Sequence, residues 1–335
     1  MGVLRTRAYV PRMTRLLLAV TTLWLGALAG CGGDPGPAPP ARPARPEAFL
    51  SVEEVAARLG APGVVLIDAR SPEDFERGHL PGAVNLPPGA IRTTAGHPHG
   101  KNLLFRLGGA GPEEPRLDAE RYAAVLGAAG VSADDEVIAY GNHAGKADGS
   151  TVLMVLDLLG HRGPLRFLDG VGVDRWVAAG HALEAGPGPE PTPAVYEATP
   201  RAGAVWTAGD VLARLDDPGV VLWDTRSAEE FSGENPRGNA RGGHVRGARH
   251  LDYASLLDAE KGLKPAGQVA AERAAAGVAP GDLDGKTVVL YCQSATRVSL
   301  PYLLLRGQGA DVAVYDGSMG EWLNDDRYPV EAAPK

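Results

Sequence analysis

The stretch VVLIDARSPEDF, residues 64–75, decides the fold because it returns later in the chain as VVLWDTRSAEEF, residues 220–231. Eight of the twelve positions are identical, and each copy places an Asp-x-Arg triplet at the end of an apolar run. Such a run is typical of a strand that is buried on both faces of a parallel sheet. The chain therefore contains one structural unit twice.

Further matching pieces follow in the same order in both halves. The segment GHLPGA at 78–83 matches GHVRGA at 243–248, and the strand pattern EVIAY at 136–140 matches TVVLY at 287–291. An Asp-Gly pair followed by a tryptophan, Trp176 or Trp322, closes each half. We expect one domain at residues 48–184, a Pro-rich linker at 185–203 and a second domain at 204–333.

Within each half, short apolar strands alternate with helical patterns, which predicts an α/β fold. A capping box at residues 51–54 begins the first helix. We expect two tandem domains, each a doubly wound, mainly parallel sheet flanked by helices. The elements expected are strands 63–67, 136–140, 165–168, 287–291 and 312–315, and helices 117–126, 151–159, 208–215 and 298–306. Functional loops of such a sheet lie at the carboxyl ends of its strands.

The first 30 residues have the pattern of an export signal. Four arginines lie ahead of or at the start of an apolar stretch at 16–30 that is too short to cross a membrane comfortably. The run Leu-Ala-Gly-Cys at 28–31 resembles the bacterial lipobox, with an ordinary cleaved signal as the alternative. We expect a lipoprotein signal peptide at 1–30, lipid on Cys31 and a Pro/Gly/Ala-rich tether at 31–47. The protein would then be lipid-anchored in a bacterial cell envelope, facing the periplasm or the exterior.

The formal charge limits the class of partner. It is −8 for the whole chain, and loss of the four arginines of the leader moves it to −12. Such an acidic protein is a poor candidate for binding nucleic acid or an anionic lipid surface. An anionic substrate would need a local basic pocket.

The chain has two cysteines, Cys31 and Cys292. If Cys31 carries lipid, Cys292 is a lone thiol in an exported protein, for which chemical reactivity is the leading explanation. Cys292 ends a strand pattern and opens the loop CQSATR, residues 292–297. In the first copy the aligned residue is Gly141, so that half has no sulfur at this place.

The paired Asp-x-Arg strands, the two Gly-His-x-x-Gly-Ala segments, the Cys292 loop and the Asp-Gly…Trp endings together resemble the tandem-domain rhodaneses, over nearly all of residues 48–333. The resemblance implies a sulfurtransferase whose C-terminal domain is catalytic and whose N-terminal domain is inactive. Thiolate of Cys292 would attack the sulfane sulfur of a small anionic donor, thiosulfate first, and pass it to a thiophilic acceptor such as cyanide or a thiol. No organic cofactor or metal is implied, and we expect a monomer.

The loop residues supply the expected substrate contacts. A free thiol titrates near ~8.5 and falls to roughly 3.5–7.5 beside cations or at a helix N-terminus. Backbone N–H groups of the loop, including those of Gln293 and Ala295, can form a nest for the thiolate and the incoming anion. Ser294 and Thr296 add hydroxyl donors, and Arg297 adds a guanidinium for sulfonate oxygens. Ala295 replaces a glycine of the small bacterial rhodanese loop, which costs ~1 kcal/mol if the position requires positive φ.

A basic cluster follows the second Asp-x-Arg strand. The segment Gly-Glu-Asn-Pro-Arg at 233–237 resembles the Glu-Pro-Arg insertion of catalytic rhodanese halves, so Arg237 is a candidate substrate-binding residue. Arg241, Arg246 and Arg249 are interpreted as solvated surface charges. Glu230 is a departure, because the family often has a substrate-binding arginine there.

Three other positions recur in both halves, and their residues are therefore assigned structural or second-layer roles. Asp224 and Arg226 repeat Asp68 and Arg70 and predict an ion pair at the strand end; His244 and His79 predict turn residues.

Alternatives stay open at this stage. Ser294 also matches the serine of mercaptopyruvate sulfurtransferases, with His79 as a candidate for their histidine, so 3-mercaptopyruvate is the second donor. A cysteine phosphatase is less favoured, because its loop has five residues between Cys and Arg and this one has four. A non-catalytic binding module would not need Cys292 and Arg297. The pair His97 and His99 is weak evidence for a metal.

Overall fold

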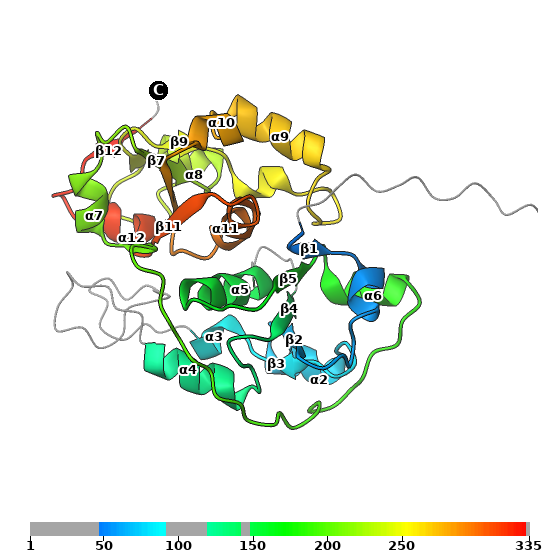
Figure 1. Cartoon of the computed structure of the whole chain (residues 1–335). Coiled ribbons are helices and arrows are strands. Elements are labelled where there is room, and N and C mark those ends of the chain that lie inside the picture. The colour runs from blue at the N-terminus through cyan, green and yellow to red at the C-terminus, as the bar shows by residue number, and fades with distance from the viewer. Residues whose placement is uncertain (1–46, 92–118, 142–147, 333–335) are drawn as a thin grey trace, which may run out of the picture. The chain divides into compact units, whose positions relative to one another are not determined.

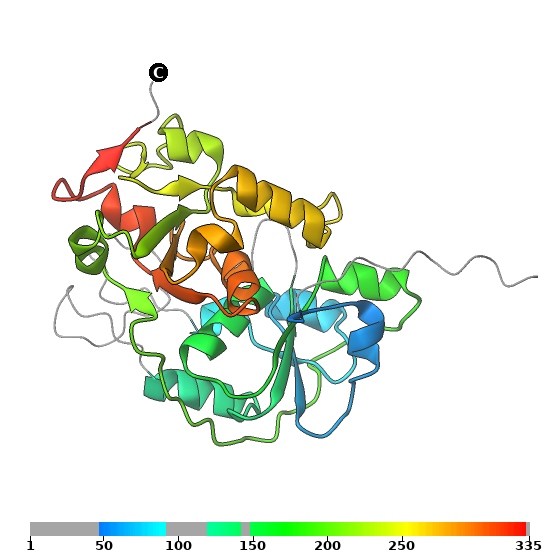
Figure 2. The same ribbon diagram turned by 45° about the horizontal axis from the view of Figure 1, so that its top comes forward.

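Two five-stranded parallel sheets with the same strand order form the framework of this computed structural model, which describes residues 47–91, 119–141 and 148–332. The first sheet has the order β1-β5-β4-β2-β3, and the second has β6-β11-β10-β7-β9, so corresponding strands occupy corresponding places. A two-stranded antiparallel sheet joins β8 to β12. Figure 1 shows each large sheet with helices around it, and Figure 2 shows the same arrangement turned forward. The predicted tandem α/β fold is confirmed.

The elements of the first half are β1 (Phe49–Leu50), α1 (Val52–Ala56), β2 (Val64–Asp68), α2 (Pro72–Arg77), β3 (Val84–Asn85), α3 (Pro88–Ile91), α4 (Ala119–Ala128), β4 (Glu136–Tyr140), α5 (Asp148–Leu158), β5 (Leu165–Leu168) and α6 (Gly172–Ala178).

Those of the second half are β6 (Val205–Trp206), α7 (Ala208–Ala213), β7 (Val220–Asp224), α8 (Ala228–Ser232), β8 (His244–Val245), β9 (Arg249–His250), the 3-10 helix η1 (Tyr253–Leu256), α9 (Ala266–Ala275), α10 (Pro280–Leu283), β10 (Thr287–Tyr291), α11 (Ser299–Arg306), β11 (Asp311–Tyr315), α12 (Ser318–Trp322) and β12 (Val330–Glu331).

Local sequence signals explain several element starts. Ser51 caps α1, and its capping box with Glu54 forms as predicted. The repeated serines Ser71 and Ser227 cap α2 and α8 in the same way, each accepting a bond from a backbone N–H of the first turn. The expected helix at 208–215 ends earlier, at Ala213, and α5 begins three residues before its expected start.

Alternate residues of each central strand enter different cores, as expected for sheets covered on both faces. In the first sheet Val137 and Ala139 face one core while Ile138 and Tyr140 face another. In the second sheet Val288 and Leu290 face the first of these cores, which also contains residues of α4, α5, α9 and α11. One continuous core therefore extends through both halves.

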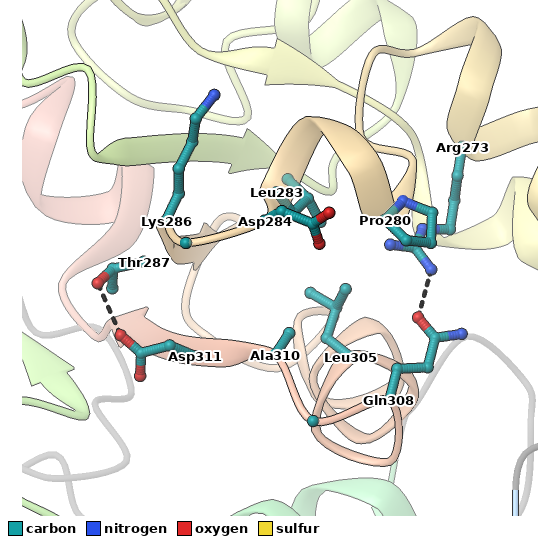
Figure 3. Close-up of a pocket in the computed structure, with 12 residues that line it drawn as sticks. Arg273, Pro280, Leu283, Asp284, Lys286, Thr287, Leu305, Gln308, Ala310 and Asp311 are labelled. Atoms are coloured by element: carbon teal, nitrogen blue, oxygen red, sulfur yellow. Dashed lines mark hydrogen bonds between the residues drawn. The ribbon is translucent and has the colours of Figure 1, made fainter.

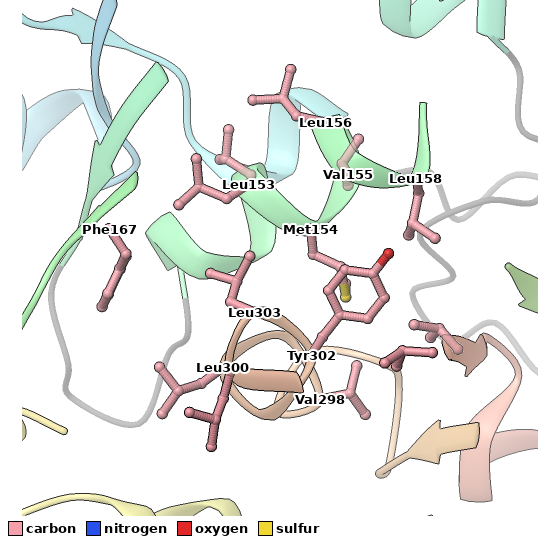
Figure 4. Packing of buried hydrophobic residues seen from close by; sticks show 14 of the residues in the cluster. Leu153, Met154, Val155, Leu156, Leu158, Phe167, Val298, Leu300, Tyr302 and Leu303 are labelled. Carbon is pink, nitrogen blue, oxygen red and sulfur yellow. The ribbon is translucent and has the colours of Figure 1, made fainter. Parts of the chain in front are cut away.

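Helices α5 and α11 pack against each other in this shared core. Figure 4 shows Met154 pointing from α5 toward Tyr302 of α11, with Leu153, Leu300 and Leu303 in the same apolar layer. Because α11 follows the Cys292 loop along the chain, this packing fixes one end of that loop.

A polar cluster around Asp157 ties the same helices together. The carboxylate of Asp157 accepts a 2.5 Å hydrogen bond from Tyr302 Oη, and bonds from Arg201 Nη1 at 2.9 Å and Arg306 Nε at 3.0 Å. Arg201 Nη1 also donates to Tyr302 Oη at 2.7 Å. Residues of the first half, the linker and the second half thus meet at one carboxylate.

The linker lies along the first half rather than spanning free space. Residues 185–200 form no helix or strand, and Figure 1 shows them as an extended strap. Ala194 N–H donates to Gly127 O at 2.9 Å, and Thr199 N–H donates to Leu159 O at 2.8 Å. At Gly160 an added Cβ would lie 2.0 Å from Thr199 O, so the close approach of the strap requires glycine there.

The predicted signal peptide, Cys31 and most of the tether lie outside the described residues. Within the ranges that the structure covers, no helix combines the length and the apolar character needed to span a membrane.

Candidate functional site

Cys292 lies at the carboxyl end of β10, the strand that pairs with β7 on one side and β11 on the other. Its side chain belongs to the buried core, and the residue is 1% exposed. In parallel sheets, this edge is where functional loops gather. Cys292 therefore lies at the middle of the carboxyl-terminal edge of the second sheet, directly after its central strand.

Ser318, the first residue of α12, anchors the Cys292 loop. Its Oγ accepts hydrogen bonds from the N–H groups of Cys292 (3.3 Å) and Ala295 (3.1 Å), and its hydroxyl donates to Tyr315 O at 2.9 Å. The N–H of Met319 donates to Cys292 O at 3.0 Å. Sequence reasoning missed Ser318. The repeat offered a signal, since the aligned residue of the first half, which lacks the cysteine, is Val171.

Two buried backbone positions of the site have left-handed conformations. Ala295 has φ 51°, which is the condition under which the alanine was expected to cost ~1 kcal/mol relative to glycine. Ser318 also has φ 51°. Both residues are fully buried, so the surrounding packing holds these conformations in place.

The predicted anion ligand Arg297 is already paired with a carboxylate. Its Nη1 and Nη2 donate to the two oxygens of Glu230 at 2.5 Å and 2.8 Å. Arg237 approaches the same carboxylate, with 3.7 Å between Nε and Oε1. The structure thus brings together both predicted arginines and the glutamate that departs from the family pattern.

The pKa values of this pair follow from its geometry. Burial alone would raise the pKa of Glu230, but the hydrogen bonds and charge of Arg297 outweigh burial and lower it. Burial would lower the pKa of Arg297, but Glu230 and the nearby Cys292 raise it. Arg297 therefore stays a cation within electrostatic reach of the sulfur.

A reciprocal amide pair joins Gln293 to the insertion, the segment of residues 233–243 between α8 and β8. Gln293 Nε2 donates to Asn239 Oδ1 at 3.1 Å, and Asn239 Nδ2 donates to Gln293 Oε1 at 3.2 Å. Asn324 Nδ2 adds a bond to Asn239 Oδ1 at 3.0 Å. The side chain of Gln293 therefore holds the insertion in place, while the backbone of Gln293 belongs to the Cys292 loop.

The rest of the loop has a side-chain hydrogen bond of its own and backbone N–H groups that indicate an anion site. Thr296 Oγ1 donates to Ser294 O at 3.4 Å, within the loop itself. Across the described ranges, no protein acceptor is recorded for the backbone N–H groups of Gln293, Ser294 and Arg297. These donors are of the type expected for a nest around an anion.

Tyr253 is a second residue that sequence reasoning missed. It begins η1, directly after the β9 edge strand, and its N–H donates to Thr225 O at 3.2 Å. Burial raises the pKa of Tyr253; the charge of Arg297 opposes this, and Asp252 and Cys292 add to it. Its phenol therefore lies within electrostatic reach of both Cys292 and Arg297.

The repeated Asp-x-Arg residues form the same buried ion pair in both halves. In the second half Arg226 Nε and Nη2 bind Asp224 at 3.0 and 2.7 Å, and Nη2 also donates to Gly243 O at 2.8 Å.

In the first half Arg70 binds Asp68 and Gly78 O with matching geometry. Each pair holds the glycine that precedes the repeated histidine, and Asp224 and Arg226 are fully buried.

The two repeated histidines occupy equivalent places. His244 Nδ1 lies 2.9 Å from Phe231 O, and its ring stacks on Phe231 with centroids 3.5 Å apart. His79 makes the same contacts with Phe75. Burial lowers the pKa of His244. The recorded contacts of His79, including Glu184 at 3.8 Å, are within its own half and not with Ser294.

The prediction of a solvated charge is wrong for Arg241. Its guanidinium donates to the backbone carbonyls of Trp322 (2.7 Å), Tyr328 (2.9 Å) and Asp325 (2.5 Å), and so ties the insertion to the end of α12. Arg246 does lie at the surface, where it pairs with Asp216.

Gly141 occupies in the first half the place of Cys292, and the residues after it, 142–147, lie outside the described part of the chain, as do His97 and His99. Among the residues that are described, no cluster of three or more His, Cys, Asp or Glu side chains is arranged to hold a metal ion.

Comparison with known proteins agrees with this geometry. The family model described as the rhodanese-like domain matches twice, at residues 51–179 and 207–325. The chain belongs to the rhodanese-like domain family.

The thiosulfate sulfurtransferase of Corynebacterium glutamicum is 31% identical, covering 89% of this chain and 94% of its own. That of Azotobacter vinelandii is 29% identical, covering 83% and 94%. A probable 3-mercaptopyruvate sulfurtransferase of Pseudomonas aeruginosa is 29% identical, covering 84% and 97%. These relatives confirm the predicted class of enzyme, a sulfurtransferase.

Solved structures share the fold at lower identity. SseA from Escherichia coli, described as a 3-mercaptopyruvate sulfotransferase, has a TM-score of 0.64 at 24% identity and covers 81% of this chain and 98% of its own. An anaerobic ergothioneine biosynthesis enzyme from Chlorobium limicola has a TM-score of 0.71 at 20% identity, with coverages of 87% and 72%.

We predict that Ser318→Ala lowers both the stability and the sulfur-transfer activity. The N–H groups of Cys292 and Ala295 would lose their buried acceptor, at a cost of about 1–3 kcal/mol. Urea unfolding and steady-state assays measure the two effects. Thr192→Ala, which removes one exposed hydroxyl of the linker, is the control and should change stability by less than about 0.5 kcal/mol. A Ser318→Ala variant indistinguishable from wild type would contradict the anchoring role.

We predict that Glu230→Gln reduces the loss of stability in acid. Because the folded-state pKa of Glu230 lies below its unfolded-state value, its contribution is complete above the unfolded-state value and disappears as pH falls through the folded-state value. The unfolding free energy should therefore fall less steeply between about pH 5 and about pH 3 in the variant. Exposed Glu234→Gln serves as the control and should keep the wild-type slope; equal slopes for all three proteins would refute the pairing.

Proposed function

We propose that the protein moves sulfane sulfur from thiosulfate to a thiophilic acceptor through a persulfide on Cys292. The observation that carries this proposal is the placement of a lone buried thiol at the carboxyl end of β10, in a loop whose last residue, Arg297, is a cation in reach of the sulfur. The inactive half has Gly141 at the equivalent place. The thiosulfate sulfurtransferase relatives support the choice of donor.

In the proposed first step, the thiolate of Cys292 attacks the outer sulfur of thiosulfate. A bond forms between Sγ and that sulfur, the sulfur–sulfur bond of thiosulfate breaks, and sulfite leaves with the bonding electron pair. In the second step, a nucleophile such as cyanide or a thiolate takes the outer sulfur and regenerates the Cys292 thiolate. Neither step requires a metal or an organic cofactor.

The surrounding charges suit a small anion. Arg297 and Arg237 flank one carboxylate, Glu230, so the cluster keeps a net positive charge in an otherwise acidic protein. The backbone N–H groups of Gln293, Ser294 and Arg297 add donors that can bind sulfonate oxygens and the persulfide. Such donors stabilise the charge that develops on the leaving sulfite.

3-Mercaptopyruvate is the second candidate donor, favoured by Ser294 two residues after Cys292 and by the probable 3-mercaptopyruvate sulfurtransferase among the relatives. With this donor, pyruvate leaves in place of sulfite. The ratio of kcat/KM for thiosulfate and 3-mercaptopyruvate decides between the two donors.

The decisive test is the intact mass of the protein after treatment with thiosulfate. In a Cys31→Ser background, Cys292 is the only thiol, and we expect a gain equal to one sulfur atom that cyanide then removes. The matched Cys31→Ser/Cys292→Ser protein should gain nothing. If the single-thiol protein accepts no sulfur from thiosulfate or 3-mercaptopyruvate, the proposed function is wrong.

We further propose, from the sequence of residues 1–31, that the protein is a lipoprotein of the cell envelope. Cells that express the full chain and grow with labelled palmitate should yield labelled protein in the membrane fraction. Cys31→Ser should remove both the label and the membrane association, whereas Cys292→Ser should retain them. Label that persists in Cys31→Ser would exclude lipid attachment at that residue.

A further inference from the structure

Arg273 of α9 is a buried cation at a place where the other half has a core leucine. The segment AERAAAGV at 271–278 aligns with AVLGAAGV at 124–131, so Arg273 corresponds to Leu126. The backbone confirms this alignment: Val278 N–H donates to Arg273 O at 2.9 Å, and Val131 N–H donates to Leu126 O at 3.0 Å. Leu126 is 0% exposed and Arg273 is 2% exposed.

The charge of Arg273 has no counter-ion in the described structure. Nε donates to Val278 O at 2.9 Å, and Nη1 donates to Gln308 Oε1 at 2.6 Å, both of which are neutral acceptors. Nη2 is buried and has no hydrogen-bond partner among the described residues. Burial lowers the pKa of Arg273, and no carboxylate of the described residues forms an ion pair with it. An uncompensated buried cation destabilises a fold, because the lost hydration of the charge is not replaced.

Arg273 is one of the residues that line a cavity of about 440 Å³. The cavity lies between α9, α10, the end of α11 and the starts of β10 and β11. Figure 3 shows Arg273 reaching toward Gln308 on one side, with Leu283 and Leu305 facing the central space. A volume of this size is within the range of small-molecule sites.

The cavity is separate from the sulfur-transfer site. Thr287, the first residue of β10, lines the cavity, whereas Cys292 follows the last residue of the same strand. Five residues of strand correspond to about 16 Å. A ligand here would therefore bind at the amino-terminal edge of the sheet, opposite the catalytic edge.

The lining selects the chemical class of ligand. Pro280, Leu283, Leu305 and Ala310 are apolar, which suits a short hydrocarbon tail. Asp284 and Asp311 also line the cavity and repel a dianion such as phosphate about twice as strongly as a monoanion, while Lys286 offsets one of these charges. One buried guanidinium nitrogen without a partner matches one carboxylate.

We propose that this cavity is a binding site for a small monocarboxylate with a short apolar tail, held by an ion pair with Arg273. The carboxylate of the ligand serves as the counter-ion of Arg273, which the described residues do not provide. Its apolar tail packs against Leu283 and Leu305. This assignment does not depend on the identity of the sulfur donor.

Thermal unfolding with sodium butyrate as the probe, at constant ionic strength maintained with sodium chloride, tests the proposal. Butyrate at ten times its Kd should raise the Tm of the wild-type protein by about 2 °C. Arg273→Leu, which installs the residue of the other half, should show no butyrate shift. Without butyrate its Tm should equal or exceed that of wild type, because the unpaired charge is gone. Arg273→Met provides a second apolar variant if leucine does not pack.

Arg77→Leu is the matched control, since it removes one exposed arginine and should keep the full butyrate shift. Saturation-transfer NMR on the butyrate methyl protons should detect binding to wild type and Arg77→Leu alone. The proposal fails if butyrate does not bind wild type, or if it binds Arg273→Leu equally. A larger shift with inorganic phosphate, lost in Arg273→Leu, would overturn the monocarboxylate assignment. Persulfide formation on Cys292 should be unchanged in Arg273→Leu, so failure here and failure of sulfur transfer are distinguishable.

Discussion

The packing of α5 against α11 is the contact on which the rest of the molecule depends. It merges the cores of the two halves into one, and the carboxylate of Asp157 gathers Tyr302, Arg201 and Arg306 around the same seam. Since α11 continues directly from the Cys292 loop, the first half supports the site through this packing. The half that lacks the equivalent cysteine is thus part of one folded body with the half that contains Cys292.

The charged groups near the sulfur are two arginines and the glutamate between them, in a protein that is acidic as a whole. Glu230 takes two hydrogen bonds from Arg297 and also attracts Arg237, so it fixes the cations in place at the cost of one negative charge. An arginine held by a bidentate partner loses less conformational freedom when a substrate arrives than one in solvent. Glu230 thus holds Arg297 and Arg237 in defined positions, and among the described residues it forms ion pairs with no further cation beyond these two.

Much of the fold followed from the sequence because strand and helix signals are local and because the repeat displayed them twice. The apolar runs, the capping serines and the position of Cys292 after β10 needed no knowledge of distant residues. The side-chain partners could not be obtained in that way. Glu230 and Arg297 are separated by 67 positions and Gln293 and Asn239 by 54. Such pairs depend on how distant segments come together in the fold, which local sequence signals do not contain. The same holds for Arg241, which binds backbone carbonyls more than 80 positions away instead of water.

The duplicated Asp-x-Arg ion pair has a consequence for how relatives of this protein should be judged. The half that contains Gly141 keeps the pair with the same bonds as the half that contains Cys292. The pair therefore serves the shape of the backbone in both halves, with or without a cysteine after the central strand. The Asp-x-Arg triplet alone indicates the architecture of a half, and the residue that follows the central strand decides whether a thiol is present there.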